Sequence, residues 1–86
     1  MREFEVRFAR AARKELERLD GTVVERVFAR IETLVTEPRP VGCKKLQGAV
    51  DLWRLRVGDY RIIYCIDDAV GVVEIRAVRH RSAAYE

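Results

Sequence analysis

The sequence predicts an α+β fold in the order β-α-α-β-β-β. A two-helix hairpin is expected to pack on one face of a mostly antiparallel four-stranded sheet. Three observations predict this fold: one alternating apolar segment opens the chain, two segments of helical periodicity follow, and three more alternating segments separated by short turns complete it. With 86 residues the chain has room for a single domain, which we assign to residues 1–86.

The first strand is predicted at residues 2–7, where apolar and charged side chains alternate as in a half-buried strand. Its apolar positions are Phe4 and Val6, followed by Phe8. From Ala9 the apolar residues recur every three or four positions, which predicts an amphipathic helix that ends at Gly21.

The second helix is predicted to begin at Thr22, because Glu25 follows at the spacing of a capping box. A broad apolar stripe then continues to the Pro38 and Pro40 pair, which ends the helix. The stripe consists of Val24, Val27, Phe28, Ile31, Leu34 and Val35. A connection of about two residues makes the two helices antiparallel neighbours, and residues 37–49 are expected to form a loop.

Three strands are predicted at residues 50–57, 60–66 and 70–79, joined by turns at Gly58-Asp59 and Asp67-Asp68. Their connections are too short for crossovers, so the three strands should form an antiparallel meander. Alternation divides their side chains between two faces. One face, covered by the helices, receives Trp53, Leu55, Val57, Ile62, Tyr64 and Ile66, and the other receives Leu52, Arg54, Arg56, Arg61, Ile63 and Cys65.

The basic residues are concentrated in two segments. The formal charge of the whole chain is +3, whereas residues 44–61 and 76–81 each carry +3 and the rest of the chain carries −3. Arg54, Arg56, Arg61 and Arg81 should share one face, opposite Trp53 and Phe28. Like charges on neighbouring strands repel each other, so this face predicts an anionic partner such as a nucleic acid.

Other functional classes find little support in the sequence. Cys43 and Cys65 lack the spacing of a zinc site, and His80 is the only histidine. Charges occupy the first residues where a signal peptide needs an apolar core, and no uncharged run is long enough to span a membrane. We therefore expect a reduced, cytoplasmic protein that uses no metal, no cofactor and no membrane.

Two sets of residues on or near the basic face point to partners. Leu52, Ile63 and Cys65 are apolar residues on an otherwise charged face, which predicts that a protein segment docks there. Tyr85 lies near Arg81 in the charged C-terminal tail, and an exposed aromatic side chain beside arginine is a pair that stacks on RNA bases.

Four features of the chain carry a resemblance to a known family: the element order, Lys45-Leu46-Gln47-Gly48, the run from Trp53 to Tyr64 (WRLRVGDYRIIY), and the ending His80-Arg81-Ser82-Ala83-Ala84-Tyr85. By these features the chain resembles the RelE/ParE superfamily of bacterial and archaeal type II toxins, and its C-terminal residues favour the RelE branch. The resemblance implies the RelE-like microbial RNase fold and a metal-independent endoribonuclease that cleaves mRNA in the ribosomal A site. It also implies a cognate antitoxin encoded alongside, for which Leu52, Ile63 and Cys65 are the expected contact residues.

The resemblance also implies catalytic roles. Arg61 matches the arginine that holds the scissile phosphate, Arg81 matches the arginine near the leaving group, and Tyr85 matches a tyrosine that stacks on a base. The remaining candidate residues are Lys44, Lys45 and Arg79 for RNA binding, and Arg54, Arg56 and His80 for catalysis.

Arg54 and Arg56 stand where well-studied relatives carry lysines, one of them proposed as the base that activates the 2′-OH. A guanidinium stays protonated at neutral pH and is a poor base. We therefore assign Arg54 and Arg56 electrostatic roles and leave proton transfer to His80, or to ribosomal RNA and solvent.

Two other functions remain open on the same fold, since a fold does not determine a function. One is a ParE-like inhibitor of DNA gyrase, against which the set of Arg61, Arg81 and Tyr85 argues. The other is a catalytically inactive binding module, which the arginines at the usual lysine positions would allow.

Overall fold

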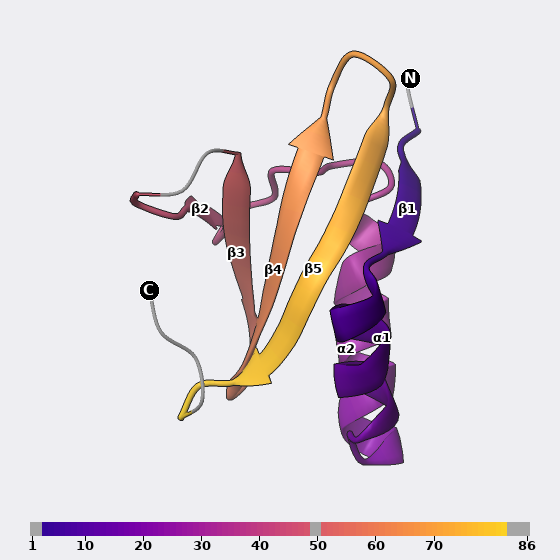
Figure 1. Ribbon diagram of the computed structural model, residues 1–86, viewed down its shortest axis with the longest axis vertical. Helices are drawn as coiled ribbons and strands as arrows, with labels where there is room; N and C mark the ends of the chain where they lie inside the picture. Colours follow the sequence, from indigo (N-terminus) through magenta and orange to yellow (C-terminus); the bar gives the residue numbers. More distant parts are fainter. Residues whose placement is uncertain (1–2, 49–50, 83–86) are drawn as a thin grey trace.

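The computed structural model describes residues 3–48 and 51–82 and has the predicted α+β fold (Figure 1). The five strands follow the order β1-β5-β4-β3-β2. Strand β1 pairs with β5 in parallel, and all other pairs are antiparallel. The elements are β1 Glu5–Phe8, α1 Arg10–Glu17, α2 Gly21–Thr33, β2 Lys44–Lys45, β3 Leu52–Val57, β4 Tyr60–Asp67 and β5 Val72–His80.

The sheet therefore has five strands, and the prediction of four was wrong. The additional strand is β2, in which Lys44 and Lys45 pair with Arg54 and Trp53 of β3. The sequence predicts a loop here because residues 37–49 contain two prolines and two glycines. Its strand character comes from the hydrogen-bonding edge that β3 offers, which is a tertiary feature.

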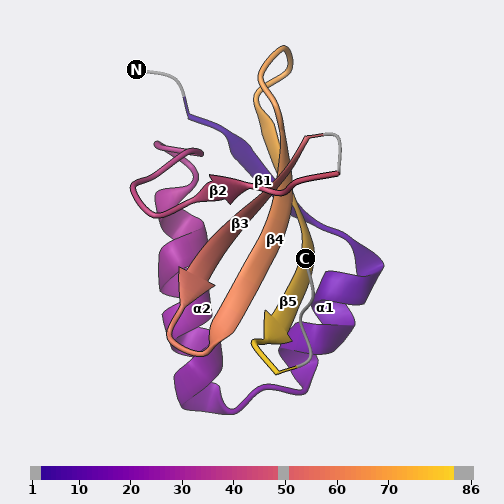
Figure 2. The ribbon, with the colours of Figure 1, turned by 90° about the vertical axis from the view of Figure 1, so that its left-hand side faces the viewer.

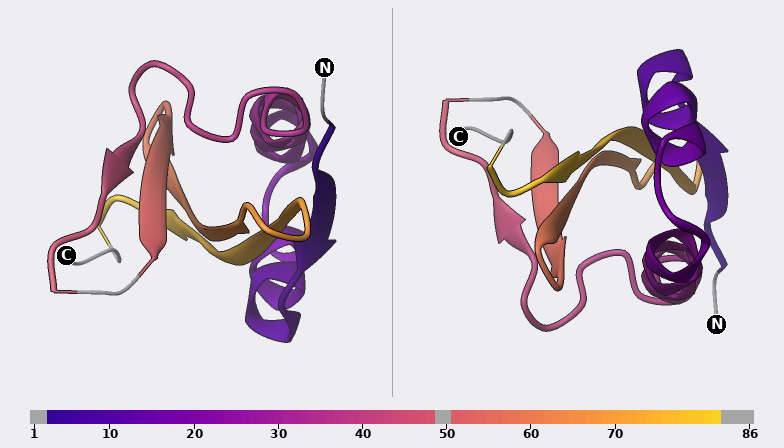
Figure 3. Two further views of the ribbon diagram at one scale, coloured as in Figure 1. Left: turned by 90° about the horizontal axis from the view of Figure 1, so that it is seen from above. Right: turned by 90° about the horizontal axis from the view of Figure 1, so that it is seen from below.

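Both helices lie on the same side of the sheet, which leaves the opposite side open (Figure 1). Seen from the open side, α2 lies behind β3 and α1 lies beside β5 (Figure 2). End views show the two helices apart from each other, with β1 and the adjoining part of β5 seen between them (Figure 3). Neither of these helices has the length and apolar character that a membrane-spanning helix needs.

The junction between the helices differs from the prediction. Helix α1 ends at Glu17, before the expected Gly21, and Gly21 is the first residue of α2. The predicted capping box at Thr22 is wrong, because the N-cap is Asp20 and no side chain caps the helix. Three residues, 18–20, separate the helices.

The core lies between the helices and the covered face of the sheet. Leu55, Ile62, Tyr64 and Ile75 are fully buried there, which confirms the predicted covered face of β3 and β4. Phe28, in contrast, is 41% exposed. Its ring packs against Phe8 at a centroid distance of 5.9 Å, at the outer edge of the core.

A bulge in β5 changes which side chains face the helices. Ile63 pairs with Ala77 whereas the next residue, Tyr64, pairs with Ile75, so Arg76 is an extra residue in the ladder. The bulge shifts the alternation by one position. Val78 consequently joins the core, and Arg79 comes opposite Arg61.

Candidate anion-binding site

A row of three arginines crosses the open face of the sheet, close to the turn that joins β3 and β4. Arg56 of β3 is directly opposite Arg61 of β4, and Arg61 is directly opposite Arg79 of β5. Directly opposed side chains share a face and stand about 5 Å apart at their Cβ atoms. The predicted placement of Arg56 and Arg61 on the face opposite the core is therefore confirmed.

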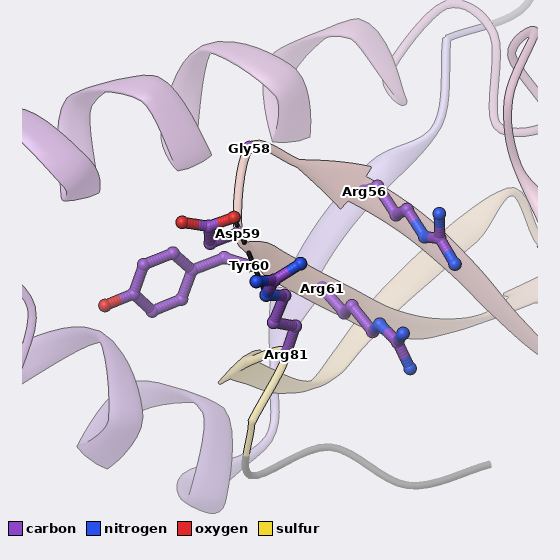
Figure 4. A pocket seen from close by; sticks show the side chains of 6 residues that line it. All are labelled: Arg56, Gly58, Asp59, Tyr60, Arg61 and Arg81. Carbon is purple, nitrogen blue, oxygen red and sulfur yellow. Dashed lines mark ion pairs between the residues drawn. The ribbon is translucent and has the colours of Figure 1, made fainter.

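Arg81 joins Arg56 and Arg61 to form a hollow of about 160 Å³, which we call the guanidinium pocket. Its other lining residues are Gly58, Asp59 and Tyr60. The guanidinium groups of Arg56 and Arg61 point the same way from adjacent strands, and Arg81 approaches from the end of β5 (Figure 4). Arg56 thus comes from β3, Arg61 comes from β4, and Arg81 is the residue directly after β5.

Asp59 holds Arg81 in two ways. Its backbone carbonyl accepts the backbone N–H of Arg81 at 2.7 Å, which continues the β4–β5 ladder by one residue. Its carboxylate lies 3.9 Å from the Nε of Arg81. Both side chains are largely exposed, so this ion pair adds little stability. The carboxylate and the Tyr60 ring point away from the guanidinium groups of Arg56 and Arg61 (Figure 4).

Arg54 belongs to a different hollow. It is directly opposite Lys44 of β2 and is only 7% exposed. It lines a hollow of about 320 Å³ together with Lys44, Lys45, Leu46 and Gln47. The structure thus groups Arg54 with the two lysines predicted for RNA binding, apart from the guanidinium pocket.

Arg79 is bound to α1. Its Nε donates to the carboxylate of Glu15 at 3.1 Å, and the same carboxylate accepts the backbone N–H of Val78 at 2.8 Å. Strand β1 pairs with β5 only as far as Ile75. Glu15 therefore satisfies an N–H group on the edge of β5 beyond the end of β1, and its charge compensates that of Arg79.

His80 lies outside the guanidinium pocket. Its ring meets Tyr60 edge-on at a centroid distance of 5.2 Å, in a hollow shared with Glu15, Leu19 and Val78. Its Nδ1 accepts the backbone N–H of Ser82 at 3.1 Å, which favours the tautomer protonated at Nε2. His80 and Arg81 lie on different sides of the sheet because they are consecutive residues, and the bulge at Arg76 determines that Arg81 is the one on the side of Arg61.

The apolar candidates lie together on the open face. Leu52 is directly opposite Cys65, and Ile63 is two positions from Cys65 on β4. All three are half-buried in the isolated chain. The thiol of Cys65 lies 3.8 Å from Glu74 Oε1. Tyr85 lies outside the described residues.

Sequence reasoning missed Asp59 and Glu15. Asp59 was assigned only to a turn, although its place in a turn between two arginine-bearing strands could have indicated contact with them. No local signal marks Glu15, because its role depends on where β1 stops. Neither residue forms part of a metal-ligand set: the described ranges hold no cluster of three His, Cys, Asp or Glu side chains.

The guanidinium pocket can bind an anion with tetrahedral oxygens. Arginine presents several N–H donors in a planar fork that matches phosphate. Three such forks around one small hollow can hold two non-bridging oxygens and a third, departing oxygen at once. The three guanidinium groups supply charge stabilisation, and a guanidinium is a poor base near neutral pH.

The chain is similar to toxins of type II toxin–antitoxin systems. Residues 6–85 match the family model described as ParE toxin of the type II toxin–antitoxin system parDE. A Methanocaldococcus jannaschii protein that carries the name toxin RelE1 is 31% identical over 88 residues, and the match covers 96% of both chains. The toxin RelE of Mycobacterium tuberculosis is 34% identical over 86 residues, covering 95% of this chain and 86% of the relative.

A solved structure agrees with both sequence relatives. The archaeal RelE–RelB complex from Pyrococcus horikoshii OT3 matches with a TM-score of 0.82 and 30% identity. The match covers 95% of this chain and 99% of the other.

Proposed function

This chain belongs to the RelE/ParE superfamily of type II toxin–antitoxin toxins, and from that membership we propose that it is a RelE-like, ribosome-dependent mRNA endoribonuclease. The observation that carries the proposal is the guanidinium pocket, which Arg56, Arg61 and Arg81 line together. Phosphoryl chemistry on RNA develops negative charge at phosphorus and at the leaving oxygen, and a pocket of fixed guanidinium groups stabilises both.

The proposed reaction is attack of a ribose 2′-oxygen on the adjacent phosphorus. The new 2′-O–P bond forms as the P–O5′ bond breaks, which yields a 2′,3′-cyclic phosphate and a free 5′-hydroxyl. Arg61 and Arg56 bind the non-bridging oxygens, and Arg81 stabilises the departing 5′-oxygen. Solvent or ribosomal RNA takes the 2′ proton, and the 5′-oxygen receives a proton from solvent, because guanidinium groups exchange protons poorly at neutral pH.

An antitoxin encoded alongside is the proposed protein partner. The solved neighbours include RelE–RelB toxin–antitoxin complexes from Pyrococcus horikoshii and Mycobacterium tuberculosis. The half-buried cluster of Leu52, Ile63 and Cys65 on the open face offers such a partner an apolar contact. It adjoins the basic residues, so one partner could cover both.

The rival function is inhibition of DNA gyrase, because the matching family model is described for ParE toxins. The two activities are distinguished by their products. A gyrase inhibitor would leave mRNA intact and accumulate gyrase cleavage complexes on DNA. An inactive binding module would cause neither effect.

The deciding experiment is primer extension on an mRNA translated in vitro, with and without the protein. We expect cuts within the A-site codon. Arg61→Ala should reduce them by about a hundredfold, the usual effect of removing one donor to a transition-state oxyanion. Arg10→Ala, an exposed substitution on α1, is the matched control. Intact mRNA with folded wild-type protein would contradict the proposal.

A further inference from the structure

A second arginine-lined hollow lies on the other side of the β3–β4 turn. Arg26 and Arg30 of α2 line it with Arg56, together with Ala29, Val57 and Gly58, and it encloses about 340 Å³. We call it the α2 pocket. It shares Arg56 and Gly58 with the guanidinium pocket, so the two hollows adjoin each other across the turn.

The turn itself allows this proximity. Gly58 has a φ of +59°, and a Cβ at this position would lie 2.6 Å from Nη2 of Arg26. The Arg26 guanidinium thus lies directly beside the turn, and the positive φ of Gly58 is a conformation that glycine adopts without strain. A charge carried by α2 is thereby brought next to the strand ends that hold Arg56 and Arg61.

The α2 pocket concentrates positive charge without an acidic partner. Arg26 and Arg30 are four residues apart on one helix, where like charges repel. Within residues 3–48 and 51–82, no carboxylate forms an ion pair with Arg26, Arg30 or Arg56. In the same ranges, the buried Nε of Arg30 has no hydrogen-bond partner. An anion in the pocket would offset this repulsion.

We propose that the α2 pocket binds a second backbone phosphate of RNA, next to the phosphate held in the guanidinium pocket. The inference rests on the proposed RNA substrate. Arg56 contacts both phosphates from the ridge between the two pockets. The RNA strand then crosses the β3–β4 turn, with the reacting phosphate at Arg61 and Arg81 and a flanking phosphate at Arg26 and Arg30.

The test compares RNA of two lengths with and without the α2 charges. The probes are 2′-O-methylated RNAs, which cannot undergo 2′-oxygen attack: a dinucleotide with one phosphodiester, and a decanucleotide. Binding is measured by fluorescence anisotropy over a series of salt concentrations. The variant is Arg26→Gln with Arg30→Gln. The control is Arg10→Gln with Lys14→Gln, which removes two exposed charges at the same spacing from α1.

The decanucleotide should bind the α2 variant about tenfold more weakly, as expected for the loss of a charged hydrogen bond. The slope of log K against log salt should fall by about 0.7, the value for one phosphate contact on a single strand. The dinucleotide should bind the wild type and the variant nearly alike. Arg26→Gln alone, away from the buried Nε of Arg30, should show the same trend if the double variant folds poorly.

The inference would be overturned if the α2 variant bound the decanucleotide with the same affinity and the same salt dependence as the wild type. So would loss of antitoxin binding alone, which would assign the α2 pocket to a protein partner. Primer extension reports separately on the proposed function. If the wild type leaves mRNA intact but the length-dependent RNA binding is present, the second phosphate site stands and the nuclease assignment falls.

The phosphate could come from the message or from ribosomal RNA, and ribosome binding distinguishes the two. Two kinds of ribosome are compared: one whose mRNA extends beyond the A-site codon and one whose mRNA ends at that codon. If the phosphate belongs to the message, the wild type should bind the first kind more tightly than the second. If it belongs to ribosomal RNA, the α2 variant loses affinity equally on both. The first result supports the proposed path of the message across the turn, and the second would overturn that path and assign the α2 pocket to a phosphate of ribosomal RNA.

Discussion

Arg56 lines both arginine pockets, so it takes part in both proposed phosphate contacts. As arginine it contributes positive charge at every pH of interest and no base. Its position opposite Arg61 places it against the proposed reacting phosphate. Its effect on catalysis should therefore be electrostatic.

Arg56→Lys tests this role. A lysine beside Arg61 and Arg81 would have a depressed pKa, since neighbouring cations disfavour its charged form. The variant should bind RNA and should gain cleavage rate as pH rises, whereas the wild type should lack this dependence. Single-turnover cleavage on programmed ribosomes across pH measures the effect. Arg56→Gln, with neither charge nor base, should be about a hundredfold slower at every pH. Superimposable profiles for Arg56→Lys and wild type would refute the assignment.

Tyr64 links the sheet to the segment before β2. Its buried hydroxyl donates to the carbonyl of Pro38 at 2.8 Å. Burial raises the pKa of Tyr64 above its ordinary value of 10.0. The folded protein thus holds the proton at a pH where the unfolded chain releases it, so this group's stabilisation is present below pH 10 and is lost as pH rises above it.

Tyr64→Phe should lower the free energy of unfolding by about 1 kcal/mol at neutral pH, the usual net value of one hydrogen bond. The difference between wild type and variant should shrink at about pH 10.5, because only the wild type carries this ionisation. Urea unfolding of both proteins at the two pH values provides the comparison. A difference that stays constant or grows with pH would contradict the buried, protonated hydroxyl.

At the scale of elements, the bulge in β5 determines the composition of the site. If Arg76 were an ordinary paired residue, alternation from Ile75 would turn Arg79 toward the helices and Val78 toward the open face. The bulge reverses both, and it also sets Arg81 rather than His80 on the open side. His80 lines a separate hollow with Glu15 and Leu19, which is why the proposed reaction assigns proton transfer to solvent or ribosomal RNA.

Deleting Arg76 should lower the free energy of unfolding by about 0.5–3 kcal/mol, because Ala77 can then follow Ile75 in a regular ladder with Val78 and Arg79 on their present sides, but β5 loses the local twist that the bulge gives it. Arg76→Ala keeps the residue count and should cost little, since its ion pair with Glu74 is exposed. Thermal unfolding followed by circular dichroism compares the two. Equal stability of the deletion and the wild type would mean that the bulge has no structural role.

Helix α1 protects the edge of β5 through Glu15. Glu15→Ala should cost about 1–3 kcal/mol, because the N–H of the buried Val78 would lose its acceptor. Glu15→Gln retains a carbonyl oxygen at this position and should cost less. Chemical denaturation of the two variants separates the hydrogen bond from the ion pair with Arg79. Similar losses for both would show that the charge pair is the larger contribution.

At the scale of the whole molecule, the helices cover one face of the sheet and leave the basic face for partners. If an antitoxin covers that face, the half-buried Cys65 should become protected on complex formation. Cys43 lies outside the open-face cluster and serves as an internal reference. Iodoacetamide labelling of Cys43→Ser and Cys65→Ser variants, free and in complex, reports on each thiol separately. Unchanged labelling of Cys65 in the complex would place the antitoxin elsewhere.

The sequence alone determined the fold class and the two faces of β3 and β4. Alternation is a local property of a strand, so it was sufficient to assign Leu55 and Ile62 to the core and Arg56 and Arg61 to the open face. The same pattern could not reveal the bulge at Arg76, because a bulge is defined by the register between two strands.

Which charged side chains lie close to one another was decided only by the tertiary structure. It separated Arg54 from the guanidinium pocket, paired Arg79 with Glu15, and brought Arg26 of α2 against Gly58. Each of these contacts depends on where one element ends beside another. Because such contacts join residues from different elements, no local pattern of residue types encodes them, and the second phosphate site depends on how α2 packs against the β3–β4 turn.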